Sequence, residues 1–147
     1  MPQTVKRVIS AVMDGFHGSC FAYGATGSGK TYTMTGDAEQ PGIMPRAISD
    51  LFAASTSEKD DYKWRFSLTY VEIYNERVKD LLNPMSGCDL DVREDARKGT
   101  HVAGAVEVAV GSLQEIMELM NRGNLYRTTE ATNCNEVSSR SHAVLQV

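Results

Sequence analysis

The feature that most constrains this chain is a short glycine-rich stretch near its start. It consists of Gly24, Ala25, Thr26, Gly27, Ser28, Gly29, Lys30 and Thr31, and it fits the phosphate-loop pattern G-x-x-x-x-G-K-S/T. Glycines leave main-chain N–H groups free to point into an anion-sized hollow. Lys30 brings a compact positive charge to the outer phosphates, and Thr31 offers a hydroxyl to Mg²⁺. The pattern therefore predicts a site for a nucleoside phosphate.

The sequence around this stretch supports the prediction, because a phosphate loop lies between a strand and a helix. Residues 20–23 form a short apolar run that predicts the strand, and residues 30–34 supply the first turns of the helix. That helix is expected to direct its N-terminal dipole at the phosphates. The alternative is a flexible glycine loop with a chance lysine, and the flanking elements argue against it.

Length, charge and cysteine content exclude several other classes of protein. A length of 147 residues suits one domain, and a net charge of -4 excludes a general binder of nucleic acid. No apolar run approaches the length of a membrane span. The cysteines Cys20, Cys88 and Cys134 lie far apart, without a C-x-x-C pair. They predict neither a zinc site nor a disulfide framework, and a reduced, cytosolic compartment is expected.

The apolar periodicity predicts an α/β fold with a largely parallel sheet. Helices are expected at residues 4–14, 46–54 and 76–82 and from 113 onward, and strands at 20–23, 64–73, 89–94, 105–110 and 142–147. Residues 112–115 predict a capping box, and Gly123 is expected to interrupt or loosen the helix that follows. The strand at 64–73 is expected to be buried on both faces and to contain a bulge.

A second polar stretch, residues 135–142, lies directly before the last predicted strand. It crowds Asn135, Ser138, Ser139, Arg140 and Ser141 into one loop. Such hydroxyls can hold Mg²⁺, a γ-phosphate oxygen and an attacking water. The alternative is a serine-rich turn that satisfies its own backbone. The presence of a phosphate loop in the same small chain favours the nucleotide-binding interpretation.

Three stretches of the chain resemble kinesin motor domains. Residues 23–34 are similar to the kinesin nucleotide loop, and YVEIYNE at 70–76, followed by DLL at 80–82, resembles a second signature. The spacing of Gly123, Arg127, Thr132, Asn135 and residues 138–142 resembles the third helix and switch I. These signatures occur in the family's order and extend through essentially the whole chain. Ala25 is a departure, because many kinesins have glutamine there. The phrases REDARKGTHVAG and SSRSHAVLQV are similar to the kinesin-8 class.

The resemblance implies a P-loop NTPase of the kinesin-motor fold, with a mostly parallel central sheet flanked by helices and incomplete at both ends. Residues 1–147 would be a partial motor domain, from the phosphate loop through switch I to the following strand. No aspartate has a glycine three residues later, so switch II and the adenine-side strand are expected outside this stretch. The fragment alone is therefore expected to be inactive.

The resemblance also implies roles for individual residues. Residues 24–31 would hold the phosphates of ATP, with Lys30 neutralising β/γ charge and Thr31 and Ser139 near Mg²⁺. Tyr32 is either a ring near the adenine or an ordinary exposed helix residue. Ser138 and Ser139 match the serines that sense the γ-phosphate and place the lytic water, and Asn135 belongs to the same catalytic stretch. Arg140 matches the arginine that latches onto an acidic residue of switch II.

A basic turn near the middle of the chain resembles a tubulin-contacting loop of kinesins. Its basic side chains are Arg93, Arg97, Lys98 and His101. The alternative is a solvated hairpin tip, where charges are common.

The function implied is that of a microtubule motor. In the full-length protein, Mg-ATP hydrolysis would drive movement along microtubules or their remodelling, in the cytoplasm on the microtubule cytoskeleton. No nucleic acid or membrane partner is expected. A nucleotide- or tubulin-binding protein without turnover is the main alternative. A GTPase-like switch is the other, but the chain lacks its N-K-x-D motif.

Overall fold

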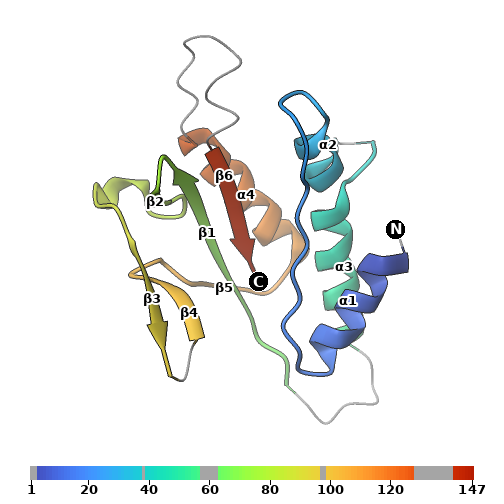
Figure 1. The fold of residues 1–147 in the computed structure, drawn as a ribbon. Coiled ribbons are helices and arrows are strands. Elements are labelled where there is room, and N and C mark those ends of the chain that lie inside the picture. The colour runs from blue at the N-terminus through green and yellow to red at the C-terminus, as the bar shows by residue number, and fades with distance from the viewer. Residues whose placement is uncertain (1–2, 38, 57–62, 97–98, 128–140) are drawn as a thin grey trace. The chain divides into compact units, whose positions relative to one another are not determined.

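The computed structural model describes residues 3–37, 39–56, 63–96, 99–127 and 141–147 (Figure 1). These residues belong to two compact units, Met1–Trp64 and Arg65–Val147. The predicted residues Asn135, Ser138, Ser139 and Arg140 lie outside the described residues, as do Arg97 and Lys98.

The first unit is helical. Its elements are α1 (Gln3–Met13), α2 (Lys30–Thr35) and α3 (Ile43–Ser55). α1 packs against α3, and Val5, Ile9 and Ile48 are buried (Figure 1). After α1 the chain returns along the helix, and a Cβ atom at Gly18 would lie only 2.6 Å from Val8 Cγ1. The predicted helix at 4–14 is thus confirmed, and its apolar stripe contributes Val5 and Ile9 to the core, while Val8, Val12 and Met13 are half-buried.

The strand predicted at residues 20–23 is wrong. Residues 16–24 belong to no helix or strand, and Phe21 and Tyr23 are exposed. An extended segment becomes a strand only when a neighbour completes its hydrogen bonds. In the described part of this unit, the β pairing is limited to the isolated bridge between Gly36 and Pro41. The phosphate loop is therefore entered from an extended segment and left through α2.

The second unit is built around one long strand, β1 (Phe66–Tyr74). Its partners are β2 (Arg77–Asp80), β5 (Val108–Val110) and β6 (Ser141–Gln146). A separate two-stranded sheet consists of β3 (Asp91–Asp95) and β4 (Gly99–Ala103), and the helical elements are η1 (Pro84–Ser86) and α4 (Leu113–Tyr126). β1 buries consecutive residues from Tyr70 to Glu72, as a strand covered on both faces does. The described pairings insert no residue into β1, so the predicted bulge is absent.

The strand directions correct the predicted sheet. Every pairing among the described strands is antiparallel, so the prediction of a mostly parallel sheet is wrong for this part of the chain. β1 and β2 are joined by Asn75 and Glu76, whose φ angles are 47° and 64°. Two consecutive left-handed residues form the tight turn of a hairpin. Glutamate rarely adopts that conformation, which explains why a helix was predicted at 76–82 instead.

The β3–β4 hairpin also differs from the prediction. Strands were expected at 89–94 and 105–110, on either side of a turn at 96–101. In the structure β4 occupies Gly99–Ala103, so part of the predicted turn is strand, and Arg93 lies directly opposite His101. All five residues of β3 are exposed.

A buried aspartate fixes the end of β2. Asp80 is 4% exposed, and its carboxylate accepts hydrogen bonds from three main-chain N–H groups. Two of the donors, Leu82 N and Asn83 N, are 2.8 and 3.2 Å from Oδ1, and Val106 N is 2.7 Å from Oδ2. These bonds compensate the burial of the charge and join β2 to the segment before β5.

Of the two hydrogen bonds of the predicted capping box of α4, the one accepted by the serine side chain is confirmed. Ser112 Oγ accepts from Glu115 N at 3.2 Å, whereas the Glu115 carboxylate accepts from Gly111 N rather than from Ser112 N. Gly123 does not interrupt α4, contrary to the prediction, but is a buried residue of the helix. A Cβ atom there would lie 2.7 Å from Tyr70 Cδ1 and 3.2 Å from Leu81 Cβ. Glycine thus lets α4 approach the sheet closely.

We therefore expect Gly123→Ala to lower the free energy of unfolding by about 1–3 kcal/mol, because overpacking outweighs the higher helix propensity of alanine. Chemical denaturation measures the change. Gly111→Ala is the matched control, because a Cβ atom there meets only Glu115 Oε2, at 3.8 Å. A Gly123→Ala protein as stable as the wild type would contradict the close approach of α4.

Candidate functional site

The glycines of the phosphate loop are needed for two different reasons. Gly27 and Gly29 have φ angles of 80° and 85°, in the left-handed region that favours glycine. At Gly24 a Cβ atom would lie 2.6 Å from Ser28 Oγ and 3.3 Å from Ser28 Cβ, so a larger residue there would displace the serine side chain. Ser28 N in turn donates to Ala25 O at 3.2 Å. Residues 24–29 therefore form a tight turn that places Lys30 at the start of α2.

Lys30 lies back over the loop that precedes it. Its Nζ atom donates to Gly24 O at 2.9 Å and to Ala25 O at 2.8 Å. Two carbonyl oxygens thus hold a positive charge against the concave turn, where phosphate oxygens can share it. Thr31 follows in the first turn of α2 and is exposed. The ammonium, the glycine turn and the hydroxyl fit the phosphates and Mg²⁺ of a bound nucleotide.

Tyr32 connects α2 to the segment that leads into α3. Its hydroxyl donates to Gln40 Oε1 at 3.2 Å, and the residue is 52% exposed. This hydrogen bond distinguishes Tyr32 from an unattached surface residue. Its place near an adenine ring stays a prediction.

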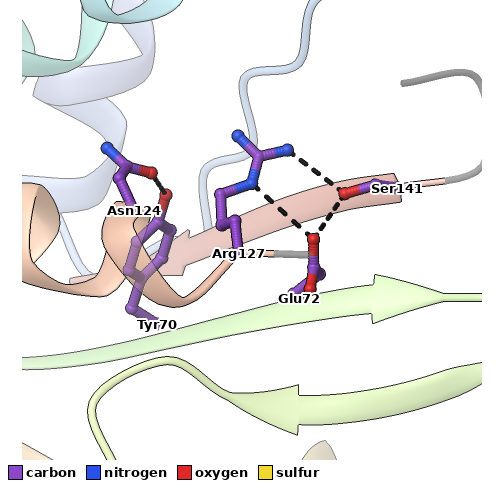
Figure 2. Close-up of polar contacts among 5 residues, drawn as sticks. All are labelled: Tyr70, Glu72, Asn124, Arg127 and Ser141. Carbon is purple, nitrogen blue, oxygen red and sulfur yellow. Dashed lines mark hydrogen bonds and ion pairs between the residues drawn. The ribbon is translucent and has the colours of Figure 1, made fainter. Parts of the chain in front are cut away.

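A polar cluster in the second unit joins three separate elements (Figure 2). Glu72 in β1 has 0% exposure, and its Oε1 accepts from Ser141 Oγ at 2.6 Å. Arg127 Nη2 donates to the same Ser141 hydroxyl at 3.3 Å, and Arg127 Nε lies 3.8 Å from Glu72 Oε1. Arg127 caps the end of α4, and Ser141 is the first residue of β6. Arg127, which precedes the predicted switch I stretch, and Ser141, which belongs to it, are therefore both attached to one buried carboxylate.

Tyr70 lies beside this cluster (Figure 2). Its hydroxyl donates to Asn124 Oδ1 of α4 at 2.7 Å. Burial raises the pKa of the Tyr70 hydroxyl above its usual value of 10.0, Arg127 opposes this rise, and Glu72 adds to it. The hydroxyl therefore keeps its proton and remains a hydrogen-bond donor to α4.

Sequence reasoning did not assign a role to this cluster. Glu72 and Arg127 belonged to the motifs that resemble kinesins, but no contact between them was predicted. A charged residue among the apolar residues of a buried strand was the available signal, because such a charge requires a partner. The partner was not evident, since Ser141 is 69 residues from Glu72 along the chain.

Among the described residues, no group of three or more His, Cys, Asp and Glu side chains could hold a metal ion. Within the same residues, no helix has both the length and the apolar character needed to cross a membrane.

A family model for the kinesin motor domain matches residues 1–147. The chain belongs to the kinesin motor-domain family. Among curated kinesins, KIF19 of Mus musculus is 49% identical over 144 residues, which are 98% of this chain and 14% of that protein. KIN-8A of Arabidopsis thaliana is 51% identical over 144 residues, 98% of this chain and 19% of that protein. The predicted similarity to kinesin-8 motors is thereby confirmed.

Solved kinesin structures confirm the predicted motor fold. A KIF14 dimer in the two-heads-bound state, with AMP-PNP and in complex with a microtubule, aligns with a TM-score of 0.82 and 37% identity. The alignment covers 95% of this chain and 40% of the KIF14 chain. This kinesin chain thus spans less than half of the solved chain and about a seventh of the length of KIF19.

The raised pKa of Tyr70 predicts a defined pH dependence. The folded state binds the phenolic proton more tightly than the unfolded state, so this contribution to stability is complete below pH 10.0 and is lost as the pH rises through the folded-state pKa. We expect the stability difference between the wild type and Tyr70→Phe to shrink above about pH 10. Denaturation curves from pH 8 to 11 measure it. A difference that stays constant across that range would contradict the raised pKa.

Proposed function

We propose that this chain is the nucleotide-binding part of a microtubule motor ATPase, a partial motor domain that runs from the phosphate loop through switch I to β6. The observation that carries the proposal is the placement of Lys30. Its Nζ atom donates hydrogen bonds to Gly24 O and Ala25 O. It thereby lies over a tight turn in which Gly27 and Gly29 adopt positive φ angles. Such a turn at the start of a helix suits the phosphates of ATP.

Thr31 and Ser139 are the proposed protein ligands that would hold Mg²⁺. Magnesium usually keeps few protein ligands and takes further oxygens from phosphate and water, so hydroxyl groups suffice. When bound, it neutralises charge on the β- and γ-phosphates. Thr31 is suitably placed at the first turn of α2. Ser138 and Asn135 are proposed to position the attacking water, and Arg140 to pair with an acidic group of the second switch.

The proposed partner is the microtubule, which places the full-length protein on the cytoskeleton. The match to KIF14 in complex with a microtubule supports this proposal. On this chain the proposed contact is the β3–β4 hairpin, where Arg93 lies opposite His101 and β3 is exposed throughout. The hairpin also carries Asp91, Glu94 and Asp95, so the proposed contact rests on its basic side chains Arg93, Arg97, Lys98 and His101 and not on a net positive charge.

The decisive experiment is phosphate release by the full-length protein with and without microtubules. Release stimulated by microtubules is expected. Binding of ATP or tubulin without release would instead support the alternative of a binding protein without turnover.

Lys30→Ala is expected to lower affinity for a fluorescent ATP analogue by roughly 10- to 100-fold, because a charge-assisted contact to phosphate is lost. Lys6→Ala is the matched control, because it removes an exposed lysine of the same unit. Equal affinities in the wild type and Lys30→Ala would refute the phosphate-loop proposal.

Titration of the fluorescent ATP analogue in the presence of EDTA tests whether Mg²⁺ contributes to nucleotide binding. Chelation is expected to weaken binding to the wild type and to have a smaller effect on Thr31→Asn, because that variant has already lost the hydroxyl ligand. A Thr31→Asn protein as sensitive to EDTA as the wild type would exclude Thr31 from the metal site.

Arg93→Glu is expected to reduce cosedimentation with microtubules, and more strongly at low salt because exposed charges are screened by ions. Arg77→Glu is the matched control. Arg77 is also an exposed arginine beside an aspartate, 3.7 Å from Asp89, whereas Arg93 is 3.1 Å from Asp91. Equal losses in both variants would show that net charge matters and the hairpin does not.

A further inference from the structure

We propose that Glu72, Arg127 and Ser141 form a clamp that fixes both ends of residues 128–140 to β1, and that these three are positioning residues for the proposed hydrolysis. The inference rests on the proposed function, because residues 128–140 include Asn135, Ser138, Ser139 and Arg140. The clamp itself consists entirely of described residues (Figure 2).

The geometry of the sheet brings Glu72 and Ser141 together. In the β1–β6 ladder, Glu72 pairs with Ala143 and Tyr74 pairs with Ser141. Residues two apart on a strand share a face, so Glu72 and Ser141 are diagonal neighbours on one face of the sheet. Arg127 reaches the same point from the end of α4. One place on β1 is thus contacted by the residue before the segment and by the residue after it.

Ser141 connects the other two residues. A hydroxyl has one proton, so with Oγ donating to the carboxylate at 2.6 Å, its lone pairs accept from Arg127 at 3.3 Å. The hydrogen bonds therefore run in one direction, from Arg127 through Ser141 to Glu72. Removal of the Ser141 hydroxyl breaks both bonds in one step.

The direct contact between Arg127 and Glu72 is weaker. Their atoms Nε and Oε1 are 3.8 Å apart, and Arg127 Nε is buried with no hydrogen-bond partner among the described residues. At that distance the two groups attract by charge but form no hydrogen bond. The serine bridge therefore supplies the directional part of the clamp. An ion pair alone would keep the charges near each other without fixing the ends of the segment.

Loss of the clamp is expected to displace the proposed catalytic residues and to leave nucleotide binding intact. A catalytic group displaced by about 1 Å can lower the rate 100-fold, whereas ATP is bound mainly by the phosphate loop. Ser141→Ala is therefore expected to lower kcat by roughly 10- to 100-fold, with little change in KM for ATP. Hydrogen exchange at residues 128–140 is expected to be faster, because their ends are less constrained.

The experiment uses the full-length protein with three variants. Ser141→Ala removes the bridge, and Ser141→Thr retains the hydroxyl on a residue that strands favour. Tyr70→Phe is the matched control, because it also removes one hydroxyl that bonds between elements of this unit, at 2.7 Å to Asn124, but leaves the clamp intact. Each protein is measured for kcat, KM, melting temperature and hydrogen exchange at residues 128–140.

The proposal is supported if Ser141→Ala alone lowers kcat and raises exchange, and threonine restores both. It is overturned if Ser141→Ala leaves either quantity unchanged, or if Tyr70→Phe changes both to the same extent, which would indicate general destabilisation. Failure of the proposed function is recognised separately, as absence of turnover in the wild type. Exchange at residues 128–140 would still decide whether the clamp holds them.

Discussion

A carboxylate with no access to water, that of Glu72, lies in the middle of the central strand, and the second unit depends on its compensation. A buried charge costs several kcal/mol unless charged or hydrogen-bonding partners surround it. Its partners include Arg127 and Ser141, from two other elements. A one-residue slip of β6 would turn Ser141 to the opposite face. The buried charge therefore specifies the register of the sheet.

Asp80 is also a buried carboxylate, but main-chain groups compensate its charge. Its carboxylate accepts from the N–H groups of Leu82, Asn83 and Val106, so no cation is needed. The phosphate loop shows the converse arrangement, because the Lys30 ammonium is satisfied by carbonyl oxygens. In each case the backbone supplies fixed dipoles that hold a charge in place. A phosphate that reaches Lys30 thus meets a cation whose position is already set.

Local patterns in the sequence predicted much of the structure. The apolar stripe of α1, the cap at Ser112 and the strand from Phe66 to Tyr74 depend on neighbouring residues, and each was found. The sheet was mispredicted because strand direction depends on partners far along the chain. The turn at Asn75 and Glu76 was missed because it lacks glycine. The phosphate loop was evident because its pattern lies within eight consecutive residues. The contacts of Glu72 with Arg127 and Ser141 were not evident, because they join residues far apart along the chain.

The β3–β4 hairpin has few described contacts with the rest of its unit. The bridge between Val78 and Leu90 and the ion pair between Arg77 and Asp89 join β2 to the segment before β3, and β3 buries none of its residues. Substitutions at exposed positions away from special contacts usually change stability by less than about 0.5 kcal/mol. The exposed side chains of β3 can therefore vary in evolution at almost no cost to folding, whereas residues 101–103 of β4 are half-buried. Related kinesin chains could differ at β3 while their nucleotide loops stay the same.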